Sequence, residues 1–95
     1  MEGNGHHPKT VSEAVSLLLA GLSDQDKASL RTIKNEDDLV MLHFSLGQAI
    51  RNDFGLWAGN QALLTSCGSA DMHPDDASMV IIRAAWKLLR RESPP

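Results

Sequence analysis

The amino-acid sequence predicts an all-α protein that folds as a single domain, a compact bundle of four to five helices. Helix start signals recur along the chain, and apolar residues follow them at spacings of three and four. No segment alternates apolar and polar residues as a half-buried strand does. The 95 residues, 42% of them hydrophobic, suffice for one small core. We therefore expect a helical domain over residues 10–91, a disordered segment over 1–9 and a frayed tail over 92–95.

The first two predicted helices are marked by their start residues. Thr10 and Glu13 have the spacing of a capping box, in which the threonine hydroxyl accepts from a helix amide and the glutamate reaches back. Gly21 is expected to end this helix in a left-handed conformation. Ser23 then opens a second helix, whose first turn carries two aspartates at the positive end of the helix dipole.

Residues 36–52 are predicted to form the third helix, which begins after Asn35. Its apolar positions follow the i, i+3, i+4 and i+7 spacing of one helix face, which consists of Leu39, Leu42, His43, Leu46, Ala49 and Ile50. Gly47 costs up to about 1 kcal/mol relative to alanine inside a helix, so another backbone or a ligand is expected close beside it. His43 is either a half-buried histidine with one hydrogen bond or a group that responds to pH or contacts a ligand.

The segment 54–60 joins this helix to a short one. It carries two glycines, which do not suit a helix, and three large apolar residues, which do not suit a solvated loop. We expect the segment to fold back onto the core. Asn60 is expected to cap a helix over 61–67 that ends at Gly68.

The aromatic residues are concentrated around one junction. Phe44, Phe54 and Trp57 surround the point where the third predicted helix meets the following loop, and Trp86 lies on the last predicted helix. The pattern predicts that these rings form the core of the domain, with the last helix covering the loop.

The last predicted helix begins at Pro74 and extends to residue 91. Proline suits the first helical position, and Asp75 and Asp76 suit the positive end of the dipole. One side is an apolar stripe of Ala77, Val80, Ile81, Ala84 and Leu88, widened by Ile82, Trp86 and Leu89. The opposite side carries the cations Arg83, Lys87, Arg90 and Arg91. These cations suit the negative end of the dipole, and they can also meet the acidic residues 36–38 or an acidic partner.

Composition and charge exclude several classes of protein. No run approaches the roughly 20 apolar residues of a membrane span, so we expect a cytoplasmic protein without membrane contact. The single cysteine excludes disulfide scaffolds and thiolate zinc fingers. Residues 1–76 carry five Lys or Arg and eleven Asp or Glu, a net −6, whereas residues 77–95 carry four and one, a net +3. This balance argues against broad nucleic-acid binding and leaves only weak binding through the basic C-terminal face.

Chemical readings of the titratable residues compete with structural ones. His73, Asp75 and Asp76, with help from His43 or Asp71, have the composition of a divalent-metal site in a small hydrolase. The favoured interpretation of this segment is a helix start, which explains every residue in it except the histidine. The sequence carries no catalytic signature, and we predict no metal site and no cofactor. Cys67 lies at a predicted helix C-terminus, where the dipole disfavours a thiolate, so we expect an inert thiol. The sequence therefore does not point to an enzyme.

The favoured function is a protein-interaction or regulatory module, whose partner is another protein or a second copy of the chain. Its predicted surface is a groove around His43, Gly47, Arg51 and Trp57, or else the basic face. A buried Arg51 requires a partner of opposite charge, and Asp53, Asp75 and Asp76 are candidates. The candidate binding residues are His43, Gly47, Arg51, Asn52, Trp57, Asn60, His73, Asp75 and Asp76.

Several short motifs resemble a known family. They are HFSLG at 43–47, IRN at 50–52, FGLW at 54–57, GNQALL at 59–64 and HPDDAS at 73–78. In this order they resemble a family of small bacterial domains of unknown function, over about residues 8–90. The resemblance implies no activity, cofactor or partner. Two positions depart from the family pattern, Ser45 in place of a frequent glycine and Asp53 in place of Asn or Ser, and Asp53 argues against anion binding through Arg51 alone.

Overall fold

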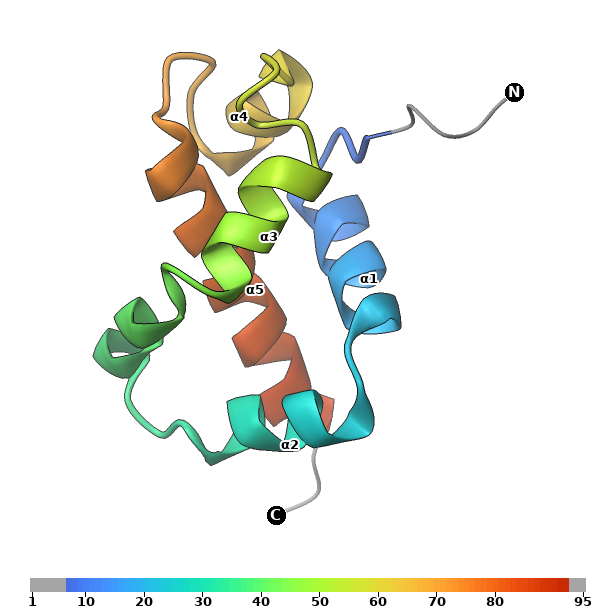
Figure 1. Ribbon diagram of the computed structural model, residues 1–95, viewed down its shortest axis with the longest axis vertical. Coiled ribbons are helices and arrows are strands. Elements are labelled where there is room, and N and C mark those ends of the chain that lie inside the picture. The colour runs from blue at the N-terminus through green and yellow to red at the C-terminus, as the bar shows by residue number, and fades with distance from the viewer. Residues whose placement is uncertain (1–6, 93–95) are drawn as a thin grey trace.

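The computed structural model describes residues 7–92, and within them every regular element is a helix. The predicted all-α class is confirmed. The predicted number of helices is too low, because the described residues form six (Figure 1). They are α1 (Val11–Gly21), α2 (Asp24–Thr32), the 3-10 helix η1 (Glu36–Leu42), α3 (Leu46–Asp53), α4 (Gln61–Cys67) and α5 (Pro74–Glu92).

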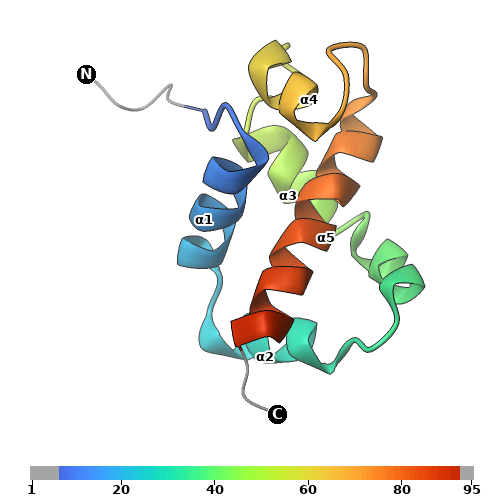
Figure 2. The ribbon, with the colours of Figure 1, turned by 180° about the vertical axis from the view of Figure 1, so that it is seen from behind.

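Helix α5 is the centre of the fold. It runs the length of the molecule, with α1 and α3 along its sides, α2 across its C-terminal part and α4 beside its start (Figures 1 and 2). Its buried residues are Ala77, Ser78, Ile81, Ile82, Ala85, Trp86 and Leu89. Val80, Ala84 and Leu88, which the sequence places in the apolar stripe, are only partly buried. All the other helices therefore depend on α5 for the burial of their apolar faces.

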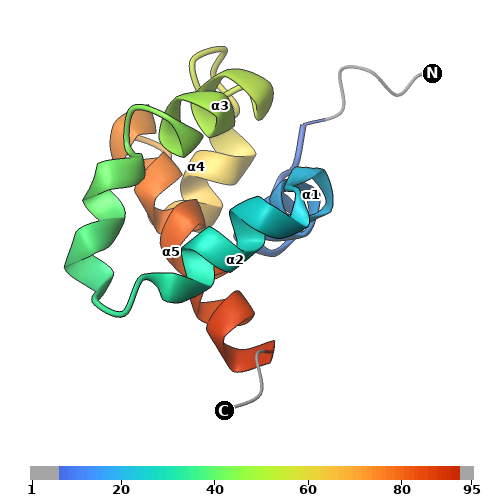
Figure 3. The same cartoon turned by 60° about the horizontal axis from the view of Figure 1, so that its bottom comes forward.

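The prediction of one continuous helix over 36–52 is wrong. The chain leaves helical geometry at Ser45, which has φ −101° and ψ −84°, so that η1 and α3 run in different directions (Figure 3). The Ser45 hydroxyl donates to the Leu42 carbonyl at 3.4 Å, a local bond that competes with the helical ladder. The predicted common face is split as a consequence: Leu39 and Ile50 are buried, Leu42 and Leu46 are partly exposed, and Ala49 is exposed.

The predicted helix starts are confirmed, with small differences in detail. The side chains of Thr10, Ser23 and Asn35 each accept a hydrogen bond from an amide in the helix that follows. Glu13 accepts from the Lys9 amide at 2.8 Å, one residue before the expected donor. Helix α1 ends at Gly21 as predicted, but the predicted left-handed conformation is wrong, because Gly21 is still helical and Leu22 caps the helix in an extended conformation.

The aromatic rings do not form one core. Phe54 and Trp86 are buried, but Phe44 is 80% exposed and Trp57 is 57% exposed. The predicted fold-back of segment 54–60 is therefore correct for Phe54 and Leu56 and wrong for Trp57. Trp86 donates from its indole Nε1 to the Ile33 carbonyl at 2.8 Å and so ties α5 to the residue that follows α2.

The chain just before α1 lies against the domain. Pro8 is buried, and its carbonyl accepts a hydrogen bond from the Asn60 side chain at 2.9 Å. Most of the predicted disordered segment over 1–9 and of the predicted tail over 92–95 lies outside the described residues. Between residues 7 and 92, no helix has the length and apolar character that crossing a lipid bilayer requires.

Candidate functional site

A buried arginine lies where α3 meets the start of α5. The Arg51 side chain is 7% exposed, and its Nε lies 3.3 Å from Asp75 Oδ1, although the N–H is not aligned for a hydrogen bond. Its two terminal nitrogens donate to Ser78 Oγ at 3.1 Å and to the His43 carbonyl at 3.3 Å. Of the three carboxylates that the sequence offers, Asp75 is the partner. The guanidinium thus connects α3 to α5 and to the turn before α3.

Gly47 makes room for this guanidinium. A Cβ atom at position 47 would lie 3.0 Å from Arg51 Nη1, 3.4 Å from the Leu42 carbonyl and 3.5 Å from Ser78 Oγ. The prediction of another backbone or a ligand beside Gly47 is correct for the Leu42 carbonyl, but the nearest atom belongs to the Arg51 side chain of the same helix. An alanine here would require Arg51 Nη1 to move by a few tenths of an ångström, because the first of these contacts is tighter than a Cβ atom ordinarily makes.

Asp75 is shared between the arginine and two histidines. Its Oδ2 lies 3.8 Å from His43 Nε2 and 3.8 Å from His73 Nδ1. His73 Nδ1 also accepts a hydrogen bond from the Asp75 backbone amide at 3.0 Å, so the imidazole caps the first turn of α5. An Nδ1 that accepts this bond carries no proton, which leaves Nε2 of His73 as the protonated nitrogen and as a donor toward solvent.

Two exposed aromatic rings extend this cluster in both directions. Phe44 makes an edge contact with His43 at 4.9 Å between ring centroids, and Trp57 makes an edge contact with His73 at 5.7 Å. We call the resulting row of side chains the aromatic–histidine strip: Phe44, His43, Asp75, His73 and Trp57. It joins three segments that are distant in sequence, and Arg51 lies buried beside its central carboxylate.

Six of the nine candidate binding residues belong to this strip or directly support it, namely His43, Gly47, Arg51, Trp57, His73 and Asp75. The other three do not. Asn52 and Asp76 are exposed and lie outside these contacts. Asn60 is structural, because its amide donates to the Pro8 and Phe54 carbonyls and its oxygen accepts from the Leu63 amide.

Sequence reasoning missed two members of the site. Phe44 was assigned to the core, since an aromatic residue inside an apolar segment is ordinarily buried. Ser78, which accepts from Arg51 and donates to the Asp75 carbonyl at 2.8 Å, is fully buried. Its position three residues after Asp75, on the same face of a helix as that carboxylate, is the signal that could have found it.

The donor geometry does not favour the metal-dependent hydrolase. Across residues 7–92, no group of three or more His, Cys, Asp or Glu side chains is placed to hold a metal ion. Asp76 is exposed and makes none of the contacts of the cluster, His73 Nδ1 is occupied by a backbone amide, and Asp75 faces a permanent cation. A second cation at Asp75 would have to compete with the Arg51 guanidinium.

The basic face of α5 is largely occupied by contacts within the fold. Glu36 forms ion pairs with two of these cations: its Oε2 lies 2.9 Å from Arg83 Nε, and its Oε1 lies 3.8 Å from Lys87 Nζ. Arg90 donates to the Ile33 carbonyl at 2.9 Å and lies over the Trp86 ring, 5.1 Å from its centroid. The predicted meeting of this face with the acidic residues 36–38 is therefore confirmed for Glu36. Three of the four cations proposed for nucleic-acid contact have partners inside the protein.

The lone cysteine is a half-buried thiol. Cys67 Sγ lies 3.6 Å from the Ala77 carbonyl, and burial raises the pKa of the thiol from 9.0 to about 11. A raised pKa agrees with the prediction that Cys67 is an inert thiol, because only the thiolate form of cysteine is nucleophilic.

The fold and the site define a small all-helical domain that displays a row of aromatic and imidazole side chains held in place by a buried arginine. The chain belongs to the family described as "Domain of unknown function (DUF6794)", whose family model matches residues 7–89. The resemblance to a domain family of unknown function is thereby confirmed. No curated protein and no solved structure matches the chain.

Replacing Asp75 should destabilise the protein more than replacing its neighbour. Both Asp75 and Asp76 lie in the first turn of α5 and gain equally from the helix dipole, but only Asp75 neutralises Arg51. We expect Asp75→Asn to lower the free energy of unfolding by about 2 kcal/mol and Asp76→Asn by less than about 1 kcal/mol. Urea denaturation of the two variants measures the difference, and equal losses would remove Asp75 from its assigned role.

The Cys67 thiol should react slowly in the folded protein. A pKa of about 11 in place of 9.0 leaves, at pH 8, about one hundredth of the thiolate of a free cysteine. The folded protein holds the thiol proton more tightly than the unfolded chain does, so protonated Cys67 favours the folded state. This contribution to the free energy of unfolding is complete below pH 9 and is lost as the pH rises through 11. Thiol labelling at pH 8 should accelerate about a hundredfold in urea, whereas equal rates would contradict the assigned burial.

Proposed function

We propose that the protein is a protein-interaction module and that its partner binds on the aromatic–histidine strip. The observation that carries this proposal is the exposure of two large rings, 80% for Phe44 and 57% for Trp57, at the two ends of one cluster of neighbouring side chains. A lone exposed apolar residue needs no explanation in a soluble protein. Two aromatic rings placed at both ends of one supported polar cluster favour a binding surface.

The contacts of the two rings reduce the entropy lost on binding. Phe44 is in edge contact with His43, whose carbonyl accepts from Arg51, and Trp57 is in edge contact with His73, which caps α5. Each ring therefore already has one aromatic contact that favours a particular orientation. A partner that covers them gains the hydrophobic free energy of burial, about 25 cal/mol per Å² of apolar surface, against a smaller ordering cost.

The polar centre of the strip supplies orientation. Asp75 is 42% exposed and His73 is 58% exposed, so the carboxylate and the imidazole can both reach a partner. His73 offers an N–H donor and Asp75 offers acceptor oxygens, spaced between the two rings. The matching partner surface carries apolar side chains on both sides of a group that both donates and accepts hydrogen bonds, such as an amide or a hydroxyl.

Crosslinking from the strip should identify the partner. A photoreactive phenylalanine derivative replaces Trp57 in one variant and Leu17, which is 51% exposed on α1, in a matched control. We expect position 57 to form a defined adduct with one protein, or with a second copy of the chain, in cells that naturally contain it, and position 17 to form none.

Affinity measurements with the captured partner complete this test. In a binding assay Phe44→Ala and Trp57→Ala should each weaken the complex about 30-fold or more, as truncation of a central aromatic residue does, whereas Leu17→Ala should not. The proposal fails if the two positions give the same adducts, or if the strip variants remain folded and bind as tightly as the unaltered protein.

A further inference from the structure

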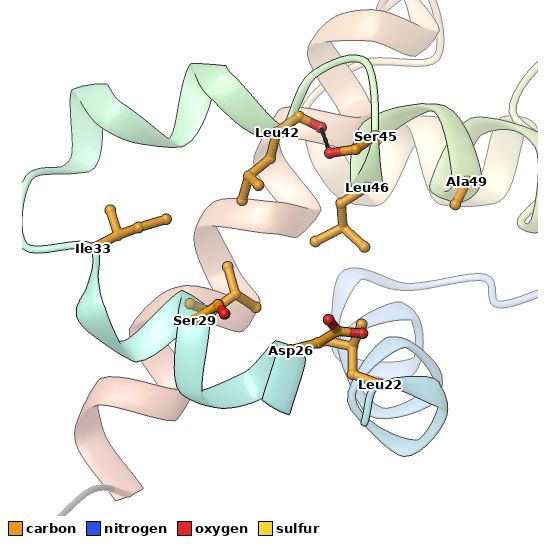
Figure 4. Close-up of a pocket in the computed structure, with 9 residues that line it drawn as sticks. Leu22, Asp26, Ser29, Ile33, Leu42, Ser45, Leu46 and Ala49 are labelled. Carbon is orange, nitrogen blue, oxygen red and sulfur yellow. Dashed lines mark hydrogen bonds between the residues drawn. The ribbon is translucent and has the colours of Figure 1, made fainter. Parts of the chain in front are cut away.

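A second surface feature, separate from the strip, lies between α2 and α3. It is a groove of about 370 Å³, lined by Leu22, Asp26, Ser29, Leu30, Ile33, Leu42, Ser45, Leu46 and Ala49. Leu42 and Leu46 point from one wall toward α2, and the Asp26 carboxylate lies near the opposite wall (Figure 4). None of these nine residues belongs to the aromatic–histidine strip.

Part of each wall of the groove is helical. On one side α2 contributes Asp26, Ser29 and Leu30, and the extended residues Leu22 and Ile33 flank the helix. On the other side α3 contributes Leu46 and Ala49, and Leu42 and Ser45 precede this helix. The helical residues recur at spacings of three and four, as on a face that packs against another helix. Yet α2 and α3 each pack on α5 and leave the groove between them.

A single ionisable group lies among the lining residues. Asp26 is the only charged residue in the groove, and among the described residues no ion pair includes it. Asp26 is solvent-exposed, so a cation of a bound partner can reach its carboxylate while the leucine and isoleucine side chains of the groove contact apolar groups of the same partner. The groove is thus complementary to an apolar surface with one positive charge.

We propose that this groove binds an amphipathic helix of a partner protein. The helix presents apolar side chains at i, i+3 or i+4, and i+7, and a Lys or Arg that faces Asp26. Helices α2 and α3 have 9 and 8 residues, so the walls span about two helical turns, which matches that set of positions. This inference does not rest on the proposed function, because it involves none of the residues of the strip.

A second copy of the chain does not offer such a helix. Among the described residues the exposed large apolar side chains are Leu17, Val40, Met41, Phe44 and Trp57. Only Leu17 of these lies on an α-helix, so no described α-helix presents two exposed large apolar residues at helical spacing. The apolar faces that the helices do have are already turned toward the chain's own core.

Selection from a peptide library tests the proposal without a known partner. Random 16-residue peptides displayed on phage are selected against the full chain, against Asp26→Lys and against two variants that fill the groove, Ala49→Trp and Ser29→Phe. Positions 29 and 49 are exposed, so the larger side chains can be accommodated outside the core. Circular dichroism and thermal unfolding identify which variants are folded. The test requires only one of the two filled variants to be folded.

We expect the peptides enriched by the unaltered chain to carry apolar residues at helical spacing and a Lys or Arg at a constant place in that pattern. Asp26→Lys should enrich Asp or Glu at the same place, and a folded filled variant should bind the selected peptides at least about tenfold more weakly. Four outcomes would each overturn the proposal. The first two are no enrichment and enriched peptides without helical spacing. The other two are a charge preference that Asp26→Lys leaves unchanged and equal binding to a folded filled variant. Phe44→Ala and Trp57→Ala should leave peptide binding unchanged, so this test distinguishes binding in the groove from partner binding on the aromatic–histidine strip.

Discussion

The burial of the Arg51 guanidinium is the interaction on which the arrangement of this protein depends. Removing an ion from water costs several kcal/mol, so the position is stable only if neighbouring groups compensate for it. Three groups do so: the Asp75 carboxylate, the Ser78 hydroxyl and the His43 carbonyl. They come from the start of α5 and from the turn before α3. The requirement to neutralise one charge therefore sets how these two segments lie relative to α3.

The aromatic–histidine strip follows from that arrangement. Asp75 is held beside Arg51, which brings His73 to one side of the carboxylate and His43 to the other. Each histidine in turn has an aromatic ring at its edge. The groove between α2 and α3 has a related origin, because the break at Ser45 turns η1 out of line with α3 and leaves Leu42 and Leu46 partly uncovered.

Local chemistry made much of the fold predictable. Thr10, Ser23, Asn35 and Asn60 each begin a helix, because capping depends on the side chain itself and on the next three residues. The need of a buried Arg51 for a carboxylate was also predictable, since it follows from the cost of an unpaired charge. For Gly47 the sequence indicated a close neighbour, but not that this neighbour is the Arg51 side chain.

Features that the apolar spacing does not report were not predicted. The spacing of apolar residues runs through 36–52 without interruption, so it gives no sign of the break at Ser45 between the 3-10 helix η1 and α3. That break changes which residues face the core, which is why Phe44 is exposed. The same limit applies to the cations of α5, whose partner Glu36 lies 47 residues before Arg83 in the sequence.

Amide hydrogen exchange in Arg51→Met tests the central claim most directly. Methionine keeps much of the length of the side chain and removes its charge and donors, and Leu63→Ala, a core substitution in α4, serves as a control for general destabilisation. If Arg51 holds the turn before α3 against α5, amides 43–47 should exchange at least about tenfold faster in Arg51→Met, and this increase should exceed any increase in α1. In Leu63→Ala, the exchange rates of amides 43–47 should not rise more than those of other amides. A uniform increase over the whole chain in both variants would contradict the account.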